Sequence, residues 1–157
     1  MRKCYLFQTQ STMQSTNFEK INKSNIHLVS SFLNQCGISL KTFRYYKKRP
    51  INICLNHIVT FVLTTSESEP LAYGHLDQEE DIVWLGIATV EKELGKGYGK
   101  QMLAKLIDFA KEKKIKKINL SVDFGNLPAI ALYSKFGFKA IQKKCDIVFY
   151  ELEIEHN

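Results

Sequence analysis

The sequence predicts a mixed α/β (α+β) fold in which helices cover the faces of a central sheet. Its 157 residues fit one ordinary domain. The hydrophobic fraction of 45% and the charged fraction of 24% are typical of a soluble globular protein. In the order of the elements, β-hairpins are followed by strand, glycine-rich loop, helix, strand, helix and strand. We expect one folded domain at residues 17–157, after an N-terminal arm at residues 1–16.

The first half of the chain starts with this arm, which is rich in Gln, Ser and Thr and is expected to hold a short strand at residues 4–7. Residues 17–21 are predicted as a strand. The helix that follows is capped by Ser24 or Asn25 and stopped by Gly37. Its apolar residues recur at helical spacing: Val29, Phe32, Leu33 and Cys36. Residues 39–46 are predicted as a second short helix that ends before Pro50.

The second half alternates strands and helices. Residues 58–63 are β-branched and aromatic and predict a strand. Residues 71–76 and 82–90 predict an antiparallel pair, joined by an acidic, solvated turn at residues 77–81. A glycine-rich loop at residues 95–99 precedes a helix at 100–114, a buried strand at 118–122 and a helix at 128–136. Strands at residues 138–141 and 147–152 complete the sheet.

The net charge of +6 is concentrated in two segments. Residues 41–49 hold five bases and no acid, and residues 91–117 hold nine lysines against four acids, so the remainder is slightly acidic. Because no recognised nucleic-acid motif accompanies the charge, we expect no nucleic-acid partner. No apolar run approaches the roughly 20 residues of a membrane helix, and no signal-peptide core is present, so we expect no membrane partner.

The cysteines and histidines predict a reduced, cytoplasmic protein without a metal. The four cysteines are scattered without a CxxC pair, and the four histidines lack zinc-ligand spacing. None of the cysteines has a partner that would support covalent catalysis.

The glycine-rich loop lies between a strand and a helix, and reads Leu94-Gly-Lys-Gly-Tyr-Gly-Lys100. Glycines let a backbone approach a ligand closely, and the free N–H groups of a helix start favour phosphate, although a glycine turn without a ligand would look the same. A P-loop is excluded because Gln101 follows Lys100. The spacing also departs from a dinucleotide-binding loop, although Asp123 near the end of the next strand leaves that class open.

Two blocks of the sequence resemble the GNAT N-acetyltransferases. The stretch from Leu85 to Gly99 resembles the family's acetyl-CoA motif, a strand and polar link followed by Q/R-x-x-G-x-G/A and a helix. The stretch from Asn126 to Phe138 resembles its N-x-x-A-x-x-x-Y-x-x-x-G-F signature. Both blocks lie in the family's order and spacing. The chain departs from the pattern at Leu94, where the family usually has Gln or Arg, so a side-chain contact is lost.

The resemblance implies a mostly antiparallel sheet, splayed in its middle, with acetyl-CoA in the split as co-substrate and no metal. The cofactor-binding residues that it implies are Ile87, Ala88, Thr89, Gly95, Lys96, Gly97, Tyr98, Gly99, Lys100, Asn126 and Tyr133. A backbone N–H in the split would stabilise the developing oxyanion. Tyr133 would protonate the leaving thiolate, since a phenol with a pKa of about 10 is a possible donor.

The proton of the acceptor amine needs a base. His75 and Asp77 lie two apart on a predicted strand and therefore on one face, and His57 is a weaker third candidate. The acceptor pocket is expected to include Phe43, Arg44, Tyr46 and His75. Bases interleaved with aromatics could neutralise and stack on a phosphorylated or nucleotide-linked acceptor, which makes a small amine, such as a nucleotide-linked amino sugar, one hypothesis. A solvated amphipathic helix with Phe43 and Tyr46 in the core is the alternative interpretation of the same segment. Protein or peptide amines, a non-catalytic acyl-CoA-binding domain and a homodimer remain alternatives.

Overall fold

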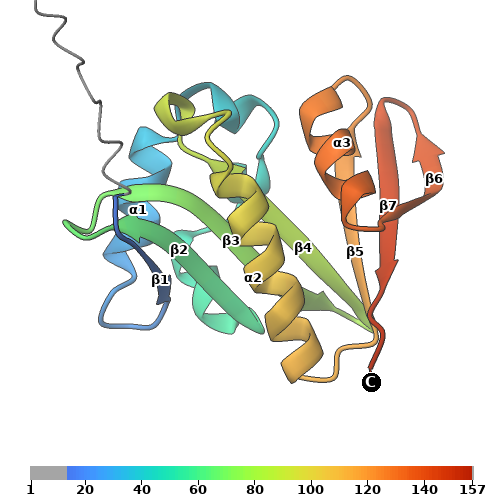
Figure 1. The fold of residues 1–157 in the computed structure, drawn as a ribbon, viewed down its shortest axis with the longest axis horizontal. Coiled ribbons are helices and arrows are strands. Elements are labelled where there is room, and N and C mark those ends of the chain that lie inside the picture. The colour runs from blue at the N-terminus through green and yellow to red at the C-terminus, as the bar shows by residue number, and fades with distance from the viewer. Residues whose placement is uncertain (1–13, 157) are drawn as a thin grey trace, which may run out of the picture.

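The computed structural model describes residues 14–156, which form one seven-stranded sheet with the strand order β1-β2-β3-β4-β5-β7-β6. All neighbouring strands are antiparallel except β4 and β5, which are parallel. The mixed, mostly antiparallel fold is therefore confirmed (Figure 1). The strand expected at residues 4–7 lies outside the described residues. Within residues 14–156 no helix has both the length and the apolar character needed to cross a bilayer.

The first part of the domain differs from the prediction after its first helix. Strand β1 (Thr16–Lys20) and helix α1 (His27–Gln35) are followed by three 3₁₀ turns: η1 (Gly37–Lys41), η2 (Tyr45–Lys47) and η3 (Ile51–Asn56). The single helix predicted at residues 39–46 was wrong. Short-range bonds replace the α-helical pattern, with Thr42 N–H donating to the Ser39 carbonyl and Lys47 N–H to that of Arg44.

The start of α1 also differs from the prediction. Ile26 is the N-cap residue and no side chain caps the helix. Asn22 and Asn25 instead stabilise the turn before it, because the Asn25 side-chain oxygen accepts from Asn22 N–H at 2.7 Å. The stop at Gly37 is confirmed by its φ of +60°, a backbone conformation that glycine adopts without strain.

The second part follows the predicted order: β2 (Val59–Thr65), β3 (Pro70–Glu79), β4 (Ile82–Thr89), η4 (Glu91–Glu93), α2 (Tyr98–Glu112), β5 (Lys117–Asp123), α3 (Leu127–Lys135), β6 (Lys139–Lys144) and β7 (Ile147–Glu153). The acidic link is shorter than expected. Asp77 and Glu79 belong to β3, and Glu79 pairs with Ile82, so only Glu80 and Asp81 form the turn. This extension of β3 brings two of the acids into the sheet.

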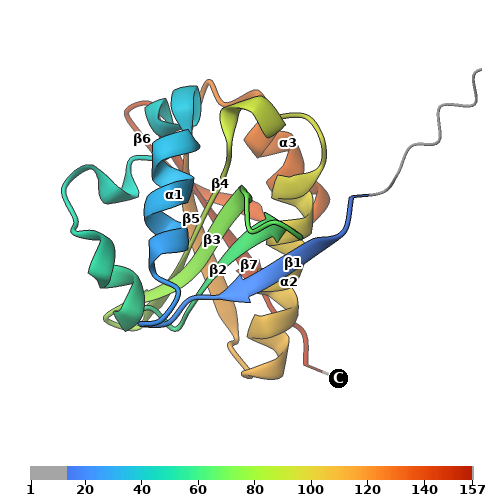
Figure 2. The same ribbon diagram turned by 90° about the vertical axis from the view of Figure 1, so that its left-hand side faces the viewer.

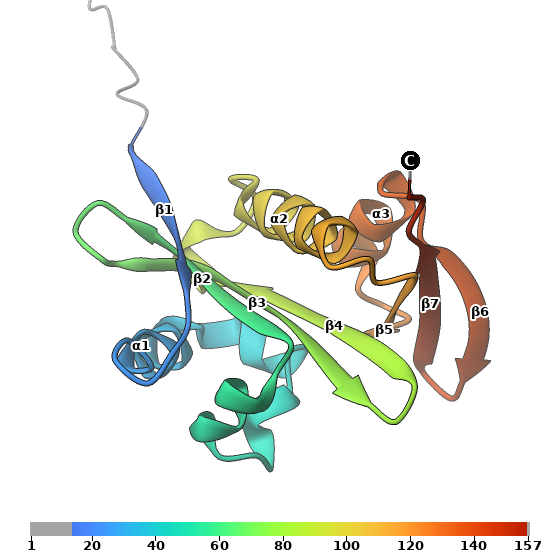
Figure 3. The same ribbon diagram turned by 90° about the horizontal axis from the view of Figure 1, so that it is seen from below.

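Helices cover both faces of the sheet. Figures 2 and 3 show α1 on one face and α2 on the other, with α3 on the same face as α2. The core under α2 includes Met102, Leu103 and Leu106, whereas the core under α1 is built around Phe32 and Tyr73. Because β3 is buried on both faces, its apolar residues form a continuous run.

The sheet is split between β4 and β5. Within the described residues, these parallel strands pair only at Trp84 and Asn119, near the start of each strand. Figure 1 shows them diverging from this point toward their carboxyl ends. The backbone of β4 from Leu85 to Thr89 therefore pairs with β3 on one side and with no strand on the other. The interrupted pairing leaves a strand edge inside the sheet.

Candidate active site

The glycine-rich loop borders open space at the start of α2. Gly95 and Gly97 have φ values of +76° and +86°, and a Cβ built on either would meet nothing within 4 Å. Gly97 is the N-cap of α2, and neither a side-chain cap nor an acid in the first turn neutralises the helix start. Unpaired N–H groups and the positive end of the helix dipole fit an anion such as pyrophosphate. Lys96 itself is paired with Glu93 at 2.8 Å, which raises its pKa.

The loop and the split are continuous. A Cβ on Gly99 would lie 3.3 Å from the Thr89 hydroxyl, so the first turn of α2 packs closely against the end of β4. Ile87 and Ala88 precede Thr89 on the same strand edge. The structure therefore brings the β4 and loop residues that the sequence predicts for cofactor binding into one line, from the split to the helix start.

Helix α3 lies across the split from β4, directly after β5 (Figure 1). Asn126 caps this helix, with its side-chain oxygen accepting from Ala129 N–H at 3.4 Å. Tyr133 is 7% exposed and its ring lies 5.7 Å from that of Phe138, centroid to centroid. Burial raises the pKa of Tyr133, which keeps its hydroxyl protonated but makes it a weaker acid than an exposed phenol.

A cavity of about 400 Å³ lies over the split. Its walls come from the 3₁₀ segments and from β3, β4, β5 and β7, and consist of Thr42, Phe43, Arg44, Tyr45, Arg49, His75, Asp77, Glu79, Trp84, Leu85, Gly86, Ser121, Val122, Asp123, Ile147 and Phe149. The lining therefore combines aromatic rings with three carboxylates and two guanidinium groups. Such a lining can hold an alkyl chain that carries charged ends.

Both arginines of the cavity are already paired with acids. Arg44 donates two hydrogen bonds to the Asp123 carboxylate, at 2.9 and 2.7 Å, which lowers the pKa of Asp123. Arg49 Nη2 lies 3.5 Å from Glu79 Oε1, and Arg49 Cζ lies 4.3 Å from the centroid of the Tyr45 ring. Two of the five bases in residues 41–49 are thus neutralised, and Asp77 is left facing the cavity.

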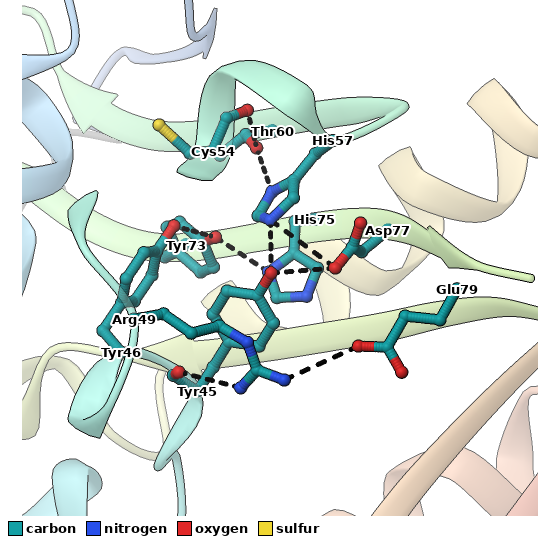
Figure 4. A network of polar contacts seen from close by, with 10 residues as sticks. All are labelled: Tyr45, Tyr46, Arg49, Cys54, His57, Thr60, Tyr73, His75, Asp77 and Glu79. Carbon is teal, nitrogen blue, oxygen red and sulfur yellow. Dashed lines mark hydrogen bonds and ion pairs between the residues drawn. The ribbon is translucent and has the colours of Figure 1, made fainter. Parts of the chain in front are cut away.

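A buried polar network lies behind Asp77 (Figure 4). The Tyr45 hydroxyl is 2.8 Å from Asp77 Oδ2 and 2.6 Å from His57 Nε2. His57 Nδ1 is 2.8 Å from the Thr60 hydroxyl. Burial lowers the pKa of His57, and the nearby Asp77 carboxylate opposes this shift.

His75 belongs to a neighbouring chain of hydrogen bonds. Its Nδ1 lies 2.7 Å from the Tyr73 hydroxyl, which in turn lies 2.7 Å from that of Tyr46. Burial lowers the pKa of His75 well below its usual value, so the ring is neutral. His75 pairs with Gly86 across β3 and β4, and a Cβ at Gly86 would lie 2.6 Å from the imidazole. Gly86 therefore makes room for the ring on the sheet surface.

The structure groups most of the predicted acceptor and base residues around one cavity. Phe43, Arg44, His75 and Asp77 all line it, whereas Tyr46 lines a second cavity beside α1. Tyr45 was not singled out by the sequence and His57 only weakly. They meet Asp77 from positions 32 and 20 residues earlier in the chain, and no local periodicity encodes that meeting. Within residues 14–156 no cluster of three metal-binding side chains occurs, and Cys36, Cys54 and Cys145 are free thiols.

Comparison with known proteins agrees with this geometry. A family model described as the acetyltransferase (GNAT) family matches residues 31–138, more than half of the chain. A Bacillus subtilis subsp. natto protein named "Probable spermine N(1)-acetyltransferase" is 43% identical over 65 residues. That match covers 40% of this chain and 43% of the relative, so it spans less than half of either protein.

Solved structures share the fold at low sequence identity. The acetyltransferase yncA from Salmonella typhimurium, solved with acetyl-CoA, has a TM-score of 0.72 at 15% identity and covers 91% of this chain and 96% of its own. The PaiA N-acetyltransferase from Thermoplasma acidophilum, solved with coenzyme A, has a TM-score of 0.69 at 16% identity, with coverages of 88% and 99%. At these identities the likeness establishes the fold alone.

Proposed function

Because the chain belongs to the acetyltransferase (GNAT) family, we propose that it moves an acetyl group from acetyl-CoA to a primary amine of a small polycationic acceptor of the polyamine class. The observation that carries the choice of acceptor is the cavity over the split, which is lined by three carboxylates together with aromatic side chains. Carboxylates attract ammonium groups, and aromatic rings pack against the methylene segments between them. The partial match to the spermine acetyltransferase supports the same acceptor class.

Acetyl-CoA would lie in the split and supply the acetyl thioester. The amides of Gly95 to Lys100 would hold its pyrophosphate at the start of α2. The free edge of β4 at Ile87 and Thr89 would bond the pantetheine arm as an added strand. Asn126, at the start of α3, would reach the same arm.

The chain's own groups then handle two protons. Asp77, on the cavity wall beside His75, would remove a proton from the acceptor's ammonium so that the neutral amine attacks directly. Tyr133, whose phenol carries a proton at neutral pH, would give that proton to the departing thiolate. Both substrates must be bound together, because no covalent carrier on the protein takes part.

The paired arginines argue against an anionic acceptor. Both guanidinium groups lie in ion pairs, so the positive charge that each offers to an anionic acceptor is offset by Asp123 or Glu79. Within residues 14–156, Asp77 is the cavity carboxylate that no arginine balances, and its charge favours an ammonium group. A nucleotide-linked amino sugar therefore stays a prediction to be tested beside the polyamines.

The acceptor is tested by measuring release of coenzyme A thiol over a panel of amines. The panel contains spermine, spermidine, a monoamine of matched length, a nucleotide-linked amino sugar and a peptide with a free N-terminus. We expect the highest kcat/KM with the polyamines. Equal or better turnover of the monoamine or of the nucleotide-linked sugar would refute the polycation assignment.

Two neighbouring acids provide a matched pair of variants. Glu79 lines the cavity, whereas Glu80 lies in the β3–β4 turn outside it. Glu79→Gln is expected to raise the KM for spermine about tenfold and to leave that for acetyl-CoA unchanged. Glu80→Gln should leave both values unchanged. The same change in both variants would mean that only the overall charge matters.

A further inference from the structure

The hydrogen bonds around His57 fix which of its nitrogens carries a proton. Thr60 has one hydroxyl proton, and its Oγ1 lies 3.3 Å from the Cys54 carbonyl, to which it donates. The same Oγ1 must then accept from His57 Nδ1, 2.8 Å away. His57 therefore has its proton on Nδ1 when neutral, and its Nε2 lone pair points to Tyr45.

Tyr45 then faces two acceptors with one proton. With His57 neutral and Asp77 ionised, its hydroxyl can donate to Nε2 at 2.6 Å or to Oδ2 at 2.8 Å, but not to both. One extra proton satisfies both contacts. On Asp77, that proton lets the carboxyl donate to Tyr45 and Tyr45 donate to His57. On His57, it lets Nε2 donate to Tyr45 and Tyr45 donate to Asp77.

These two arrangements contain the same number of protons. They interconvert when two protons move along two short hydrogen bonds, without movement of any heavy atom over a long distance. One end of the chain, Asp77, lines the cavity. The other end, the His57 side chain, has no exposed surface. The three groups therefore connect the cavity to the interior.

We propose that Asp77, Tyr45 and His57 form a proton relay that takes up the proton of the acceptor's ammonium group. The proposal rests on the acetyl transfer proposed above and adds Tyr45 and His57 to it. The ammonium gives one proton to the Asp77 carboxylate and keeps the electron pair as a neutral amine. Asp77 passes a proton to Tyr45 while Tyr45 passes its own to His57 Nε2, which leaves a carboxylate and an imidazolium. The reverse steps return the proton after the product leaves.

The groups packed around the relay favour, at neutral pH, the state without the extra proton, in which His57 is neutral and Asp77 is ionised. Arg49 stacks on Tyr45 and donates to the Tyr45 carbonyl at 3.1 Å, and Glu79 balances its charge. The His75 ring lies 4.4 Å, centroid to centroid, from the rings of both Tyr45 and His57 and is neutral. The ring of Tyr46 packs against that of Tyr45, with 5.0 Å between centroids. Cys54, whose carbonyl accepts from Thr60, carries a buried thiol. Burial lowers the pKa of His57, so its imidazole is neutral and Nε2 carries no proton before the proton of the amine arrives.

Asp77 is the member of the relay that takes the proton from the acceptor's ammonium group, and Tyr45 and His57 act through it as positioning and relay residues. A purely structural role would also hold the 3₁₀ turns against β3, so protein stability cannot distinguish the two. The shared proton can distinguish a relay from a structural role, because in a relay proton uptake at Asp77 is coupled to proton uptake at His57. The coupling exists without substrate and can be measured independently of turnover.

The first test is NMR titration of the free protein, following the His57 imidazole nitrogens and the Asp77 carboxyl carbon together. We expect both signals to report uptake of one proton with a common midpoint, and Tyr45→Phe to separate the two midpoints. Two independent titrations of these signals in the wild-type protein would overturn the relay.

The second test is the pH dependence of turnover in Tyr45→Phe, which keeps the ring contacts and removes the hydroxyl. We expect kcat at neutral pH to fall about 100-fold. The acidic limb should move toward the higher pKa of the free amine, and the KM for acetyl-CoA should stay unchanged. An unaltered pH profile would overturn the proposal.

His57→Gln provides a second variant if Tyr45→Phe does not fold, because glutamine can hydrogen-bond but does not titrate, and the same shift of the limb is expected. Tyr150→Phe is the matched control. Tyr150 lies next to the cavity residue Phe149 on β7 and therefore on the opposite face of the sheet.

If the wild-type protein turns over no amine at all, the proposed function fails and the catalytic use of the relay fails with it, whatever the NMR titration gives.

Discussion

Replacing Gly97 by alanine separates the strain of the glycine-rich loop from its role in binding. Gly97 precedes α2 with a φ of +86°, and Gly137 follows α3 with a φ of +89°. In this left-handed region an alanine costs about 1–2 kcal/mol. Both Gly97→Ala and Gly137→Ala should therefore lose that amount of stability, which corresponds to about 2–8 °C in Tm for a chain of this size.

Only one of these two alanines should affect acetyl-CoA. A Cβ at Gly97 would project into the open space beside the start of α2, whereas one at Gly137 makes an ordinary contact of 3.6 Å with Leu152. Loss of one charge-assisted hydrogen bond to the pyrophosphate costs about 1.5–3 kcal/mol. Gly97→Ala should then bind acetyl-CoA about 10- to 150-fold more weakly, and Gly137→Ala should bind it as the wild-type protein does.

The assay is isothermal titration calorimetry with acetyl-CoA, with Tm measured on the same samples. The reasoning is refuted if Gly97→Ala keeps wild-type affinity, because the glycine-rich loop at the start of α2 would then not hold the pyrophosphate. It is equally refuted if Gly137→Ala loses as much affinity, because backbone strain alone would then explain the effect.

Three further predictions address the acid, the core and the buried histidine. Tyr133→Phe should lower kcat at least tenfold with an unchanged KM for acetyl-CoA, measured by thiol release, and an unchanged kcat would remove Tyr133 from the mechanism. Gly74→Ala places a Cβ 2.6 Å from Met102 Cγ and should cost about 1–3 kcal/mol in urea unfolding; a smaller loss would mean that the α2 core repacks. Folding lowers the His75 pKa, so the unfolded chain binds a proton that the folded chain does not. The His75 contribution to stability should therefore be complete above about pH 6.5 and fall below it by at most about 1.4 kcal/mol per pH unit. It adds to that of His57, whose pKa burial also lowers, and an equally steep total fall in the wild-type protein and in His75→Gln would contradict this origin.

The alternation of strands and helices in the second half was predictable because each element carries its own local signal. The glycine-rich loop, the apolar face of α2 and Pro128 near the start of α3 are all readable along the chain. The region between Gly37 and Asn56 was not, because its 3₁₀ turns are held by ring packing against β3 rather than by periodic burial on one face. The acidic link was misjudged for a similar reason, since pairing with β4 extends β3 through Glu79.

The cofactor half of the candidate site was predictable from contiguous motifs, whereas the acceptor half was not. Asp77 and His75 could be placed on one strand face by alternation alone. The positions of Tyr45 and His57 depend on how the 3₁₀ segments fold back onto that strand. The sequence also suggests that the basic stretch at residues 41–49 offers free positive charge to an acceptor. In the structure Arg44 and Arg49 form ion pairs with Asp123 and Glu79, which come from distant strands.

The single pairing between β4 and β5 has a consequence for local opening of the sheet. Local opening at that seam disrupts one strand pairing at Trp84 and Asn119 instead of a full ladder, so we expect it to cost less than separating two fully paired strands. Amides on the β5-facing edge of β4 should exchange hydrogen for deuterium rapidly, while those bonded to β3 exchange slowly. A ligand that hydrogen-bonds along the seam would complete the ladder, and bound acetyl-CoA should therefore slow exchange on both halves of the sheet together.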